Sequence, residues 1–167
     1  MPENTTDEWK FEHFPTDIAP EKLKPFSDIL SIWQSKHNNG QLPKWADFDL
    51  PDFKGWHQNL CLCDVMENKE DSRFRIWGSA LSEVFNQNAT GMLLSEANVN
   101  YTTYDRQQYR EFVEEKSIMR CDGTLDWLGK SYKHVTLLHL PLSENEQNVD
   151  RYLVLFYEQN KLTGDAL

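Results

Sequence analysis

The chain has 167 residues, a formal net charge of -10 and a pI of about 4.9. That length fits one domain with a real core, and an aromatic content of 13% is too high for a disordered chain. The acidic balance argues against binding to nucleic acid or to an anionic membrane, because both need clustered Lys and Arg.

The N-terminal segment is polar and acidic, so it has no signal-peptide pattern. No apolar run is long enough to span a bilayer. The three cysteines are an odd number, give no disulfide framework and fit a reducing compartment. We therefore expect a cytoplasmic protein.

The first half of the chain predicts one helix and an irregular connection. Residues 1–19 are polar with scattered aromatic side chains, and we expect an arm there rather than an element. From residue 20 apolar residues recur at spacings of three and four, which predicts a helix over 20–37. Its apolar stripe consists of Leu23, Phe26, Ile29, Leu30 and Trp33. Residues 40–58 form an aromatic-rich connection with one helical turn after Pro51.

The second half predicts two strands, two helices and three strands. Alternation predicts a hairpin of strands over 60–66 and 73–77, followed by a short helix over 79–85. A longer helix begins at Thr102, where Asp105 is placed to complete a capping box. Its buried side is expected to consist of Tyr109, Phe112, Val113 and Lys116. After a break at Asp122-Gly123, the closing strands are predicted over 124–128, 132–142 and 151–159.

This order of elements predicts an α+β fold. We expect a five-stranded antiparallel sheet with helices on one face and an N-terminal flanking helix. We expect the chain to be divided into an N-terminal arm over 1–19, the flanking helix over 20–40, a sheet domain over 41–160 and a C-terminal tail over 161–167.

Several short motifs narrow the choice among α+β folds. They are Ile29-Leu30-Ser31-Ile32-Trp33, Gly40-Gln41-Leu42-Pro43, the aspartate-rich stretch 47–52, Arg73-Phe74-Arg75-Ile76-Trp77-Gly78-Ser79, Thr90-Gly91 and His139-Leu140-Pro141-Leu142. In this order and spacing, residues 25–158 resemble PAS domains, and in particular a PAS subfamily of short, mostly alphaproteobacterial proteins of uncharacterised function. One departure is Trp45, where that subfamily more often has Arg.

The resemblance implies a sensory or protein-interaction module whose ligand would lie between the inner sheet face and the helices. It implies no particular ligand, because PAS domains bind haem, flavins, small metabolites or nothing. Residues 86–94 lack the cysteine of photoactive flavin-binding PAS domains, and residues 102–119 lack the histidine that haem-binding ones place on the long helix. We therefore predict that the protein binds neither cofactor.

Eight residues are candidates for lining such a pocket, because aromatic walls with a few polar tips are typical of small-ligand sites. They are Trp77, Tyr101, Tyr104, Tyr109, Trp127, Tyr132, His134 and Thr136. The same composition also fits a core that its own side chains fill. Which face of strand 132–142 lines the pocket stays open, although His134 and His139 must lie on opposite faces.

Metal and catalytic signatures are absent from the sequence. Cys61 and Cys63 would share one face of a strand, but a zinc site needs two further ligands and no second close pair exists. We interpret both as small buried hydrophobes. No phosphate-binding loop, His-Glu-x-x-His pair or nucleophile elbow occurs, so we expect no enzyme.

The leading hypothesis is a stand-alone sensory module that binds a small molecule or a signalling partner without catalysis. The alternatives are a ligand-free structural dimer or scaffold and, less favoured, a small enzyme of another α+β fold. A homodimer through helix 20–37 is predicted, because its stripe and Ile32 together exceed what one sheet needs for burial. In the competing arrangement, this helix covers the outer sheet face, including Arg75 and Trp77, in a monomer.

Overall fold

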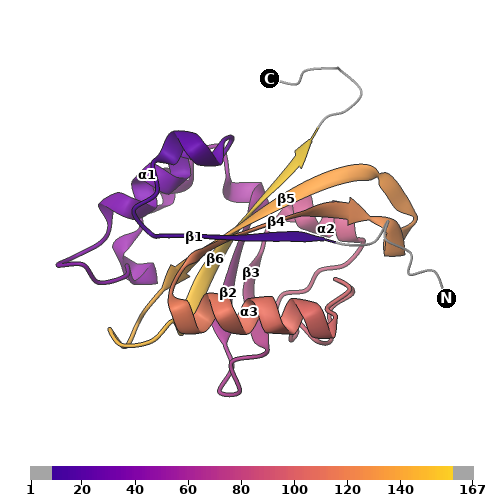
Figure 1. Ribbon diagram of the computed structural model, residues 1–167. Helices are drawn as coiled ribbons and strands as arrows, with labels where there is room; N and C mark the ends of the chain where they lie inside the picture. The colour runs from indigo at the N-terminus through magenta and orange to yellow at the C-terminus, as the bar shows by residue number, and fades with distance from the viewer. Residues whose placement is uncertain (1–8, 160–167) are drawn as a thin grey trace.

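A computed structural model describes residues 9–159, and its framework is an antiparallel sheet of six strands in the order β1-β4-β5-β6-β2-β3 (Figure 1). The strands are β1 (Lys10–Phe14), β2 (Leu60–Val65), β3 (Ser72–Trp77), β4 (Ile118–Leu125), β5 (Lys130–Leu142) and β6 (Arg151–Gln159). After β1, the predicted succession of two strands, helices and three strands is present, so the α+β class is confirmed. The predicted tail over 161–167 lies outside the described residues.

Strand β1 corrects part of the arm that was expected over 1–19, of which residues 1–8 lie outside the described residues. β1 pairs with β4 and places Phe11 opposite Cys121, which adds a sixth strand to the five that were expected. Trp9 and Phe11 alternate with charged residues, the period-two pattern of a half-buried strand. Trp9 fits against Gly123, where an added Cβ would lie 2.4 Å from the indole ring.

Both helices between β3 and β4 agree with the prediction. α2 (Ser79–Phe85) has the predicted bounds, and α3 (Thr103–Glu115) starts after a capping box. The Asp105 amide donates to the Thr102 hydroxyl at 3.2 Å, and the Thr102 amide donates to the Asp105 carboxylate at 2.8 Å. Lys116 is not on the buried side as predicted, because it adopts a left-handed conformation that ends the helix and is exposed.

The strand after α3 differs from the expectation of a break at Asp122-Gly123 and a strand over 124–128. Both residues of that pair lie inside β4, and residues 126–128 form a single 3-10 turn, η6. Asp122 is accommodated in the sheet because its carboxylate accepts hydrogen bonds from Arg120 and Thr136. A polar pair that resembles a turn is therefore stabilised by a neighbour on the same strand and by one across the sheet.

The predicted hairpin is present as β2 and β3, with an irregularity that orients its side chains. Cys63 pairs with Phe74, whereas the residue before it pairs with Ile76, so Arg75 is an extra residue on β3. Such a bulge interrupts strict alternation. Phe74 and Trp77 therefore face the same core. Trp77 lies on the inner face, as its place among the pocket candidates requires, and not on the outer face as in the competing arrangement.

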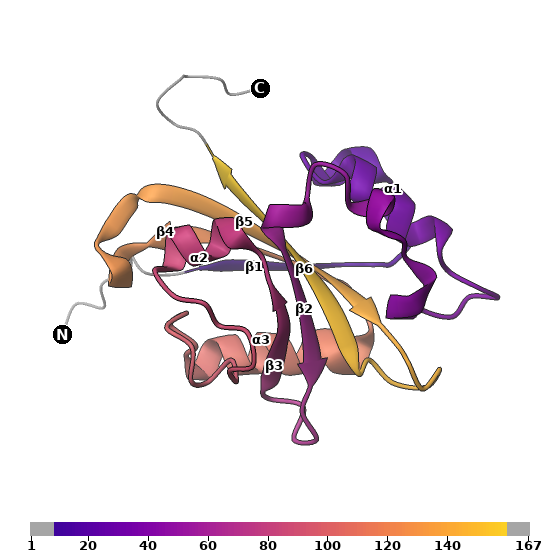
Figure 2. The same cartoon turned by 180° about the vertical axis from the view of Figure 1, so that it is seen from behind.

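The sheet separates two hydrophobic cores, so helices cover both of its faces rather than one (Figures 1 and 2). Strand β6 shows the division, because Tyr152 and Val154 belong to one core while Leu153 and Leu155 belong to the other. We call the face covered by α2 and α3 the inner face. The outer face is covered by α1 (Ser27–Ser35) and the segments around it.

The predicted helix over 20–37 is shorter and interrupted. A 3-10 turn, η2 (Pro20–Leu23), precedes α1, and Lys24 between them is extended. Pro25 explains the interruption, because the residue before a proline is disfavoured in the α conformation. The connection that follows contains three further 3-10 turns, η3 (Trp45–Asp47), η4 (Leu50–Phe53) and η5 (His57–Asn59).

The apolar stripe of this segment is covered within the monomer. Its five residues are at most 1% exposed and pack on outer-face leucines of β2, β5 and β6. Trp33 also donates its indole N–H to the carbonyl of Pro141 at 3.1 Å. The stripe therefore gives no reason to expect a dimer, and homodimerisation stays a prediction that would need another surface.

Among residues 9–159, no helix is long and apolar enough to cross a membrane.

Candidate ligand cavity on the inner face of the sheet

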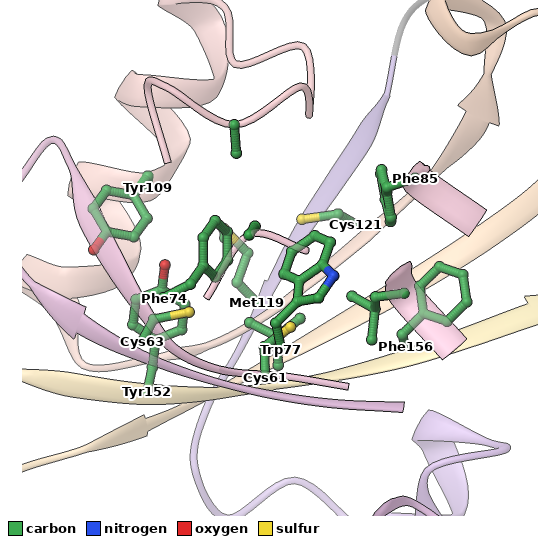
Figure 3. Packing of buried hydrophobic residues seen from close by; sticks show 14 of the residues in the cluster. Cys61, Cys63, Phe74, Trp77, Phe85, Tyr109, Met119, Cys121, Tyr152 and Phe156 are labelled. Atoms are coloured by element: carbon green, nitrogen blue, oxygen red, sulfur yellow. The ribbon is translucent and has the colours of Figure 1, made fainter. Parts of the chain in front are cut away.

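A cavity of about 120 Å³ lies between the inner face of the sheet and the helices α2 and α3. Its lining is mostly apolar and comes from every strand as well as from the loop that precedes α3. Phe74, Trp77 and Phe85 lie next to one another beside this space, with Met119 and Cys121 close by on β4 (Figure 3). The cavity is thus formed by segments that are far apart in the sequence.

Aromatic rings form a continuous wall along one side of the cavity. The ring centroids of Trp9 and Trp127 are 6.2 Å apart, and those of Trp127 and Phe85 are 6.4 Å apart. The wall continues from Phe85 to Trp77 at 5.6 Å and from Trp77 to Phe74 at 4.9 Å. Most of these contacts are tilted or edge-to-face, the arrangements that aromatic pairs prefer.

Four of the eight candidate residues line the cavity. They are Trp77 on β3, Tyr101 in the loop before α3, Tyr109 on α3 and Trp127 in η6. Three of the four donate hydrogen bonds to backbone carbonyls: Trp77 to that of Gln87, Tyr101 to that of Glu70 and Trp127 to that of Asn98. Their polar atoms are therefore satisfied by backbone. The Arg106 guanidinium lies over the Tyr101 ring at 5.4 Å from its centroid, whereas the indole rings of Trp77 and Trp127 line the cavity.

The other four candidates lie elsewhere. Tyr104 is 55% exposed on α3, and Tyr132 is 67% exposed near the start of β5. His134 and Thr136 lie on the outer face, in register with the outer-core residues of β5. Leu137 and His139 line the cavity from β5, so the face of this strand that carries odd-numbered residues at these positions is the one toward the cavity. His134 and His139 therefore lie on opposite faces of β5, as predicted.

Sequence reasoning missed the rest of the cavity lining, and four of the missed residues matter most for its shape and charge. Trp9 and Phe11 reach it from β1, Asp105 from the first turn of α3 and His139 from β5. The alternating pattern of residues 9–14 is the signal that could have identified the first two. Nothing in the sequence shows that β1 lies beside β4, because that pairing joins distant segments.

Comparison with known proteins found a solved structure that resembles this fold. No protein-family model matches the sequence, and no curated protein does. A solved structure described as an RNA-binding light-oxygen-voltage receptor, a protein of PAS type, superposes with a TM-score of 0.51 over 91% of this chain at 10% identity. The fold is PAS-like. The aligned part is 39% of that receptor's chain, so the likeness concerns one region of a longer protein.

A buried hydroxyl cluster supports one end of the cavity in this PAS-like fold. Tyr152 donates to the Ser72 hydroxyl at 2.9 Å, and Tyr109 is hydrogen-bonded to the same oxygen. All three side chains are buried, and burial raises the pKa of both tyrosines. Because buried hydroxyls are costly to leave unpaired, this cluster fixes α3 against β3 and β6.

The three cysteines of the PAS-like fold are buried thiols, as the sequence predicts for Cys61 and Cys63. Burial raises the pKa of Cys61 to about 12 and raises those of Cys63 and Cys121 as well. A thiol is nucleophilic only as its thiolate, so these side chains act as small apolar groups. Over residues 9–159, no group of three His, Cys, Asp or Glu side chains is arranged to hold a metal ion.

His139 makes the stability of the PAS-like fold dependent on pH. Burial lowers its pKa to about 4 from an ordinary value of 6.5, so the folded protein keeps it neutral while the unfolded chain protonates. The unfolded state binds more protons between these two values, and the contribution of His139 is therefore lost as the pH falls from 6.5 to 4.

We expect the His139→Phe variant to lose about 3 kcal/mol less stability than the wild type on acidification from pH 7 to pH 4. Phenylalanine keeps a flat ring beside Tyr152, whose ring stacks on His139, but it cannot titrate. Urea unfolding at a series of pH values measures the difference. Parallel pH profiles for the two proteins would show that His139 is accessible to protons in the folded state.

Asp105 is the one acidic side chain in the cavity lining of the described residues, and that lining contains neither Lys nor Arg. Burial raises the pKa of this carboxyl group, partly offset by its hydrogen bonds to Thr102. With His139 neutral, the ionised carboxylate of Asp105 is the charge that this cavity lining offers to a ligand.

Proposed function

We propose that this protein is a PAS-type sensory module that binds a small molecule in the inner-face cavity and passes the signal to a protein partner. The observation that carries the proposal is the volume of the inner-face cavity. Native cores are close-packed and seldom contain voids larger than a water molecule. An apolar cavity of about 120 Å³ beside a wall of aromatic rings therefore favours ligand binding over a filled core.

The size of the cavity indicates the size of the ligand. An engineered apolar cavity of roughly 150 Å³ binds benzene, so about one ring fits a space like this one. Haem and flavins are several times larger, which supports the expectation that neither is the ligand. The side chains of the lining are aromatic and aliphatic with few polar tips, so the ligand is expected to be largely apolar.

The proposal also covers the cellular location, the catalytic activity and the partners of this module. We place it in the cytoplasm, without catalytic activity, and in the PAS subfamily that its motifs resemble. We expect no nucleic-acid partner, because a net charge of -10 opposes phosphate binding. The output is association with a signalling protein, with homodimerisation as a further prediction.

We expect ligand binding to depend on the open space of the cavity. Val154 lines it from β6, and Val154→Phe fills part of it, whereas Val65→Phe makes the same change at the end of β2 away from the cavity. Benzyl alcohol at ten times its dissociation constant should raise the melting temperature of the wild type and Val65→Phe by about 3–6 °C. The Val154→Phe variant should show no shift.

Native mass spectrometry of freshly purified protein complements this experiment, because a retained small molecule would identify the natural ligand. A wild-type protein that carries no small molecule and is not stabilised by benzyl alcohol would favour the ligand-free scaffold instead.

A further inference from the structure

The cavity lining combines aromatic ring faces with one carboxylate, and both of these features attract positively charged groups. Aromatic faces carry partial negative charge and attract cations within about 6 Å of the ring centroid. Trp9, Trp77 and Trp127 contribute the rings with the strongest attraction of this kind. In Figure 3, Trp77 lies between Phe74 and Phe85 in the middle of this wall.

The carboxylate of Asp105 is only partly used by the protein. One oxygen accepts the Thr102 amide at 2.8 Å as part of the capping box. Within residues 9–159, no residue other than Thr102 is hydrogen-bonded to this carboxylate, and Asp105 forms no ion pair. The carboxylate therefore keeps acceptor capacity for a ligand while its position is fixed by the helix start.

An anionic ligand would be disfavoured in this cavity. A carboxylate or phosphate in this cavity would lie near Asp105 and the negative ring faces, and no Lys or Arg side chain of the lining could offset the loss of its hydration. His139 cannot supply a positive charge at neutral pH, because burial lowers its pKa to about 4. The lining therefore disfavours acids and favours neutral or cationic molecules.

We propose that the ligand of this cavity is a small organic cation, an amine with an aromatic or compact apolar body of about one ring, whose ammonium group pairs with Asp105. This inference rests on the proposed ligand-binding function and adds the chemical class of the ligand. The apolar body lies against the aromatic wall formed by Trp9, Trp127, Phe85, Trp77 and Phe74. The ammonium donates to the Asp105 carboxylate.

Three probes of similar shape and different charge test the proposal: benzylamine as the cation, benzyl alcohol as the neutral isostere and benzoate as the anion. Tryptophan fluorescence reports binding, because three of the six tryptophans line the cavity. Benzylamine should bind the wild type about tenfold or more tighter than benzyl alcohol does. Benzoate should bind more weakly than either.

Two variants separate Asp105 from the overall charge of the protein. Asp105→Asn keeps a carbonyl oxygen that can accept the Thr102 amide, but it removes the charge. We expect it to reduce benzylamine binding to the level of benzyl alcohol and to leave benzyl alcohol unaffected. Asp28→Asn is the matched control, since it removes one exposed acid on α1 and should change none of the three affinities.

The outcomes distinguish this inference from the proposed function. If benzyl alcohol and benzoate bind as tightly as benzylamine, or if Asp105→Asn leaves the preference for benzylamine intact, the cavity binds ligands but the charge preference is wrong. If none of the three probes binds, both the proposed ligand-binding function and this inference are wrong. A preference that is lost equally in Asp28→Asn would show non-specific attraction and also overturn the inference.

Discussion

Phe26→Glu should leave the chain largely unfolded at 25 °C. Phe26 is 0% exposed in the outer-face core, where its ring stacks on Trp56 at a centroid distance of 5.3 Å and meets the edge of Tyr157 at 6.3 Å. The substitution removes these contacts and places a carboxylate in an apolar site. We expect a loss of at least about 5 kcal/mol, which is comparable to the entire stability of a typical domain.

Circular dichroism measures the unfolding, and Ile32→Glu is the control. Ile32 is on the same helix but only partly buried, so its substitution should cost about 1 kcal/mol. Light scattering on the same samples addresses the predicted homodimer. A Phe26→Glu variant that stays folded and changes from dimer to monomer would show that the stripe is an interface, and the burial described above would then be wrong.

Gly78→Ala should destabilise the protein by about 3 kcal/mol or more. The backbone of Gly78 has φ -61° and ψ 150°, which alanine adopts without strain, so the effect comes only from lack of space. A Cβ at this position would lie 2.2 Å from the Gln58 carbonyl oxygen and 2.7 Å from its carbon. Backbone atoms cannot move aside as a flexible side chain can, and α2 would have to separate from the turn η5.

Urea unfolding of Gly78→Ala and of the neighbouring control Ser79→Ala tests this expectation. Ser79 is exposed at the first position of α2, and its substitution should change stability by less than about 0.5 kcal/mol. Because α2 carries Leu81 and Phe85 into the cavity lining, Gly78→Ala should also weaken the binding of benzyl alcohol. A variant as stable as the wild type would mean that α2 and η5 are less closely packed than described.

Elements with local signals could be predicted from the sequence. The helix α2 has the predicted bounds, the capping box of Thr102 and Asp105 marks the start of α3, and the closing strand over 151–159 is present as expected. These signals depend on neighbouring residues, because capping and periodicity are properties of short segments. The order of such elements predicted the α+β class, whereas the resemblance to PAS domains rested on the short motifs.

Features that depend on distant pairing could not be predicted. Asp122-Gly123 resembles a turn until Trp9 and Thr136 are placed beside it. The extra residue Arg75 brings Phe74 and Trp77 to one face, which no alternating pattern indicates. The candidate site was predicted in part for the same reason, since membership of its lining depends on strand register and on the position of β1.

The pairing of β1 with β4 has a consequence for the order of folding. The register places Lys10 opposite Asp122, so β1 cannot pair with β4 until β2, β3, α2 and α3, which lie between them in the sequence, have been synthesised. Joining segments that are so distant requires the closure of a long loop, which is slow compared with the formation of a local hairpin such as that of β2 and β3. Trp9 and Phe11 are therefore expected to be among the last side chains to enter the inner-face core, and a nascent chain would leave the side of the cavity next to β4 open to water until then.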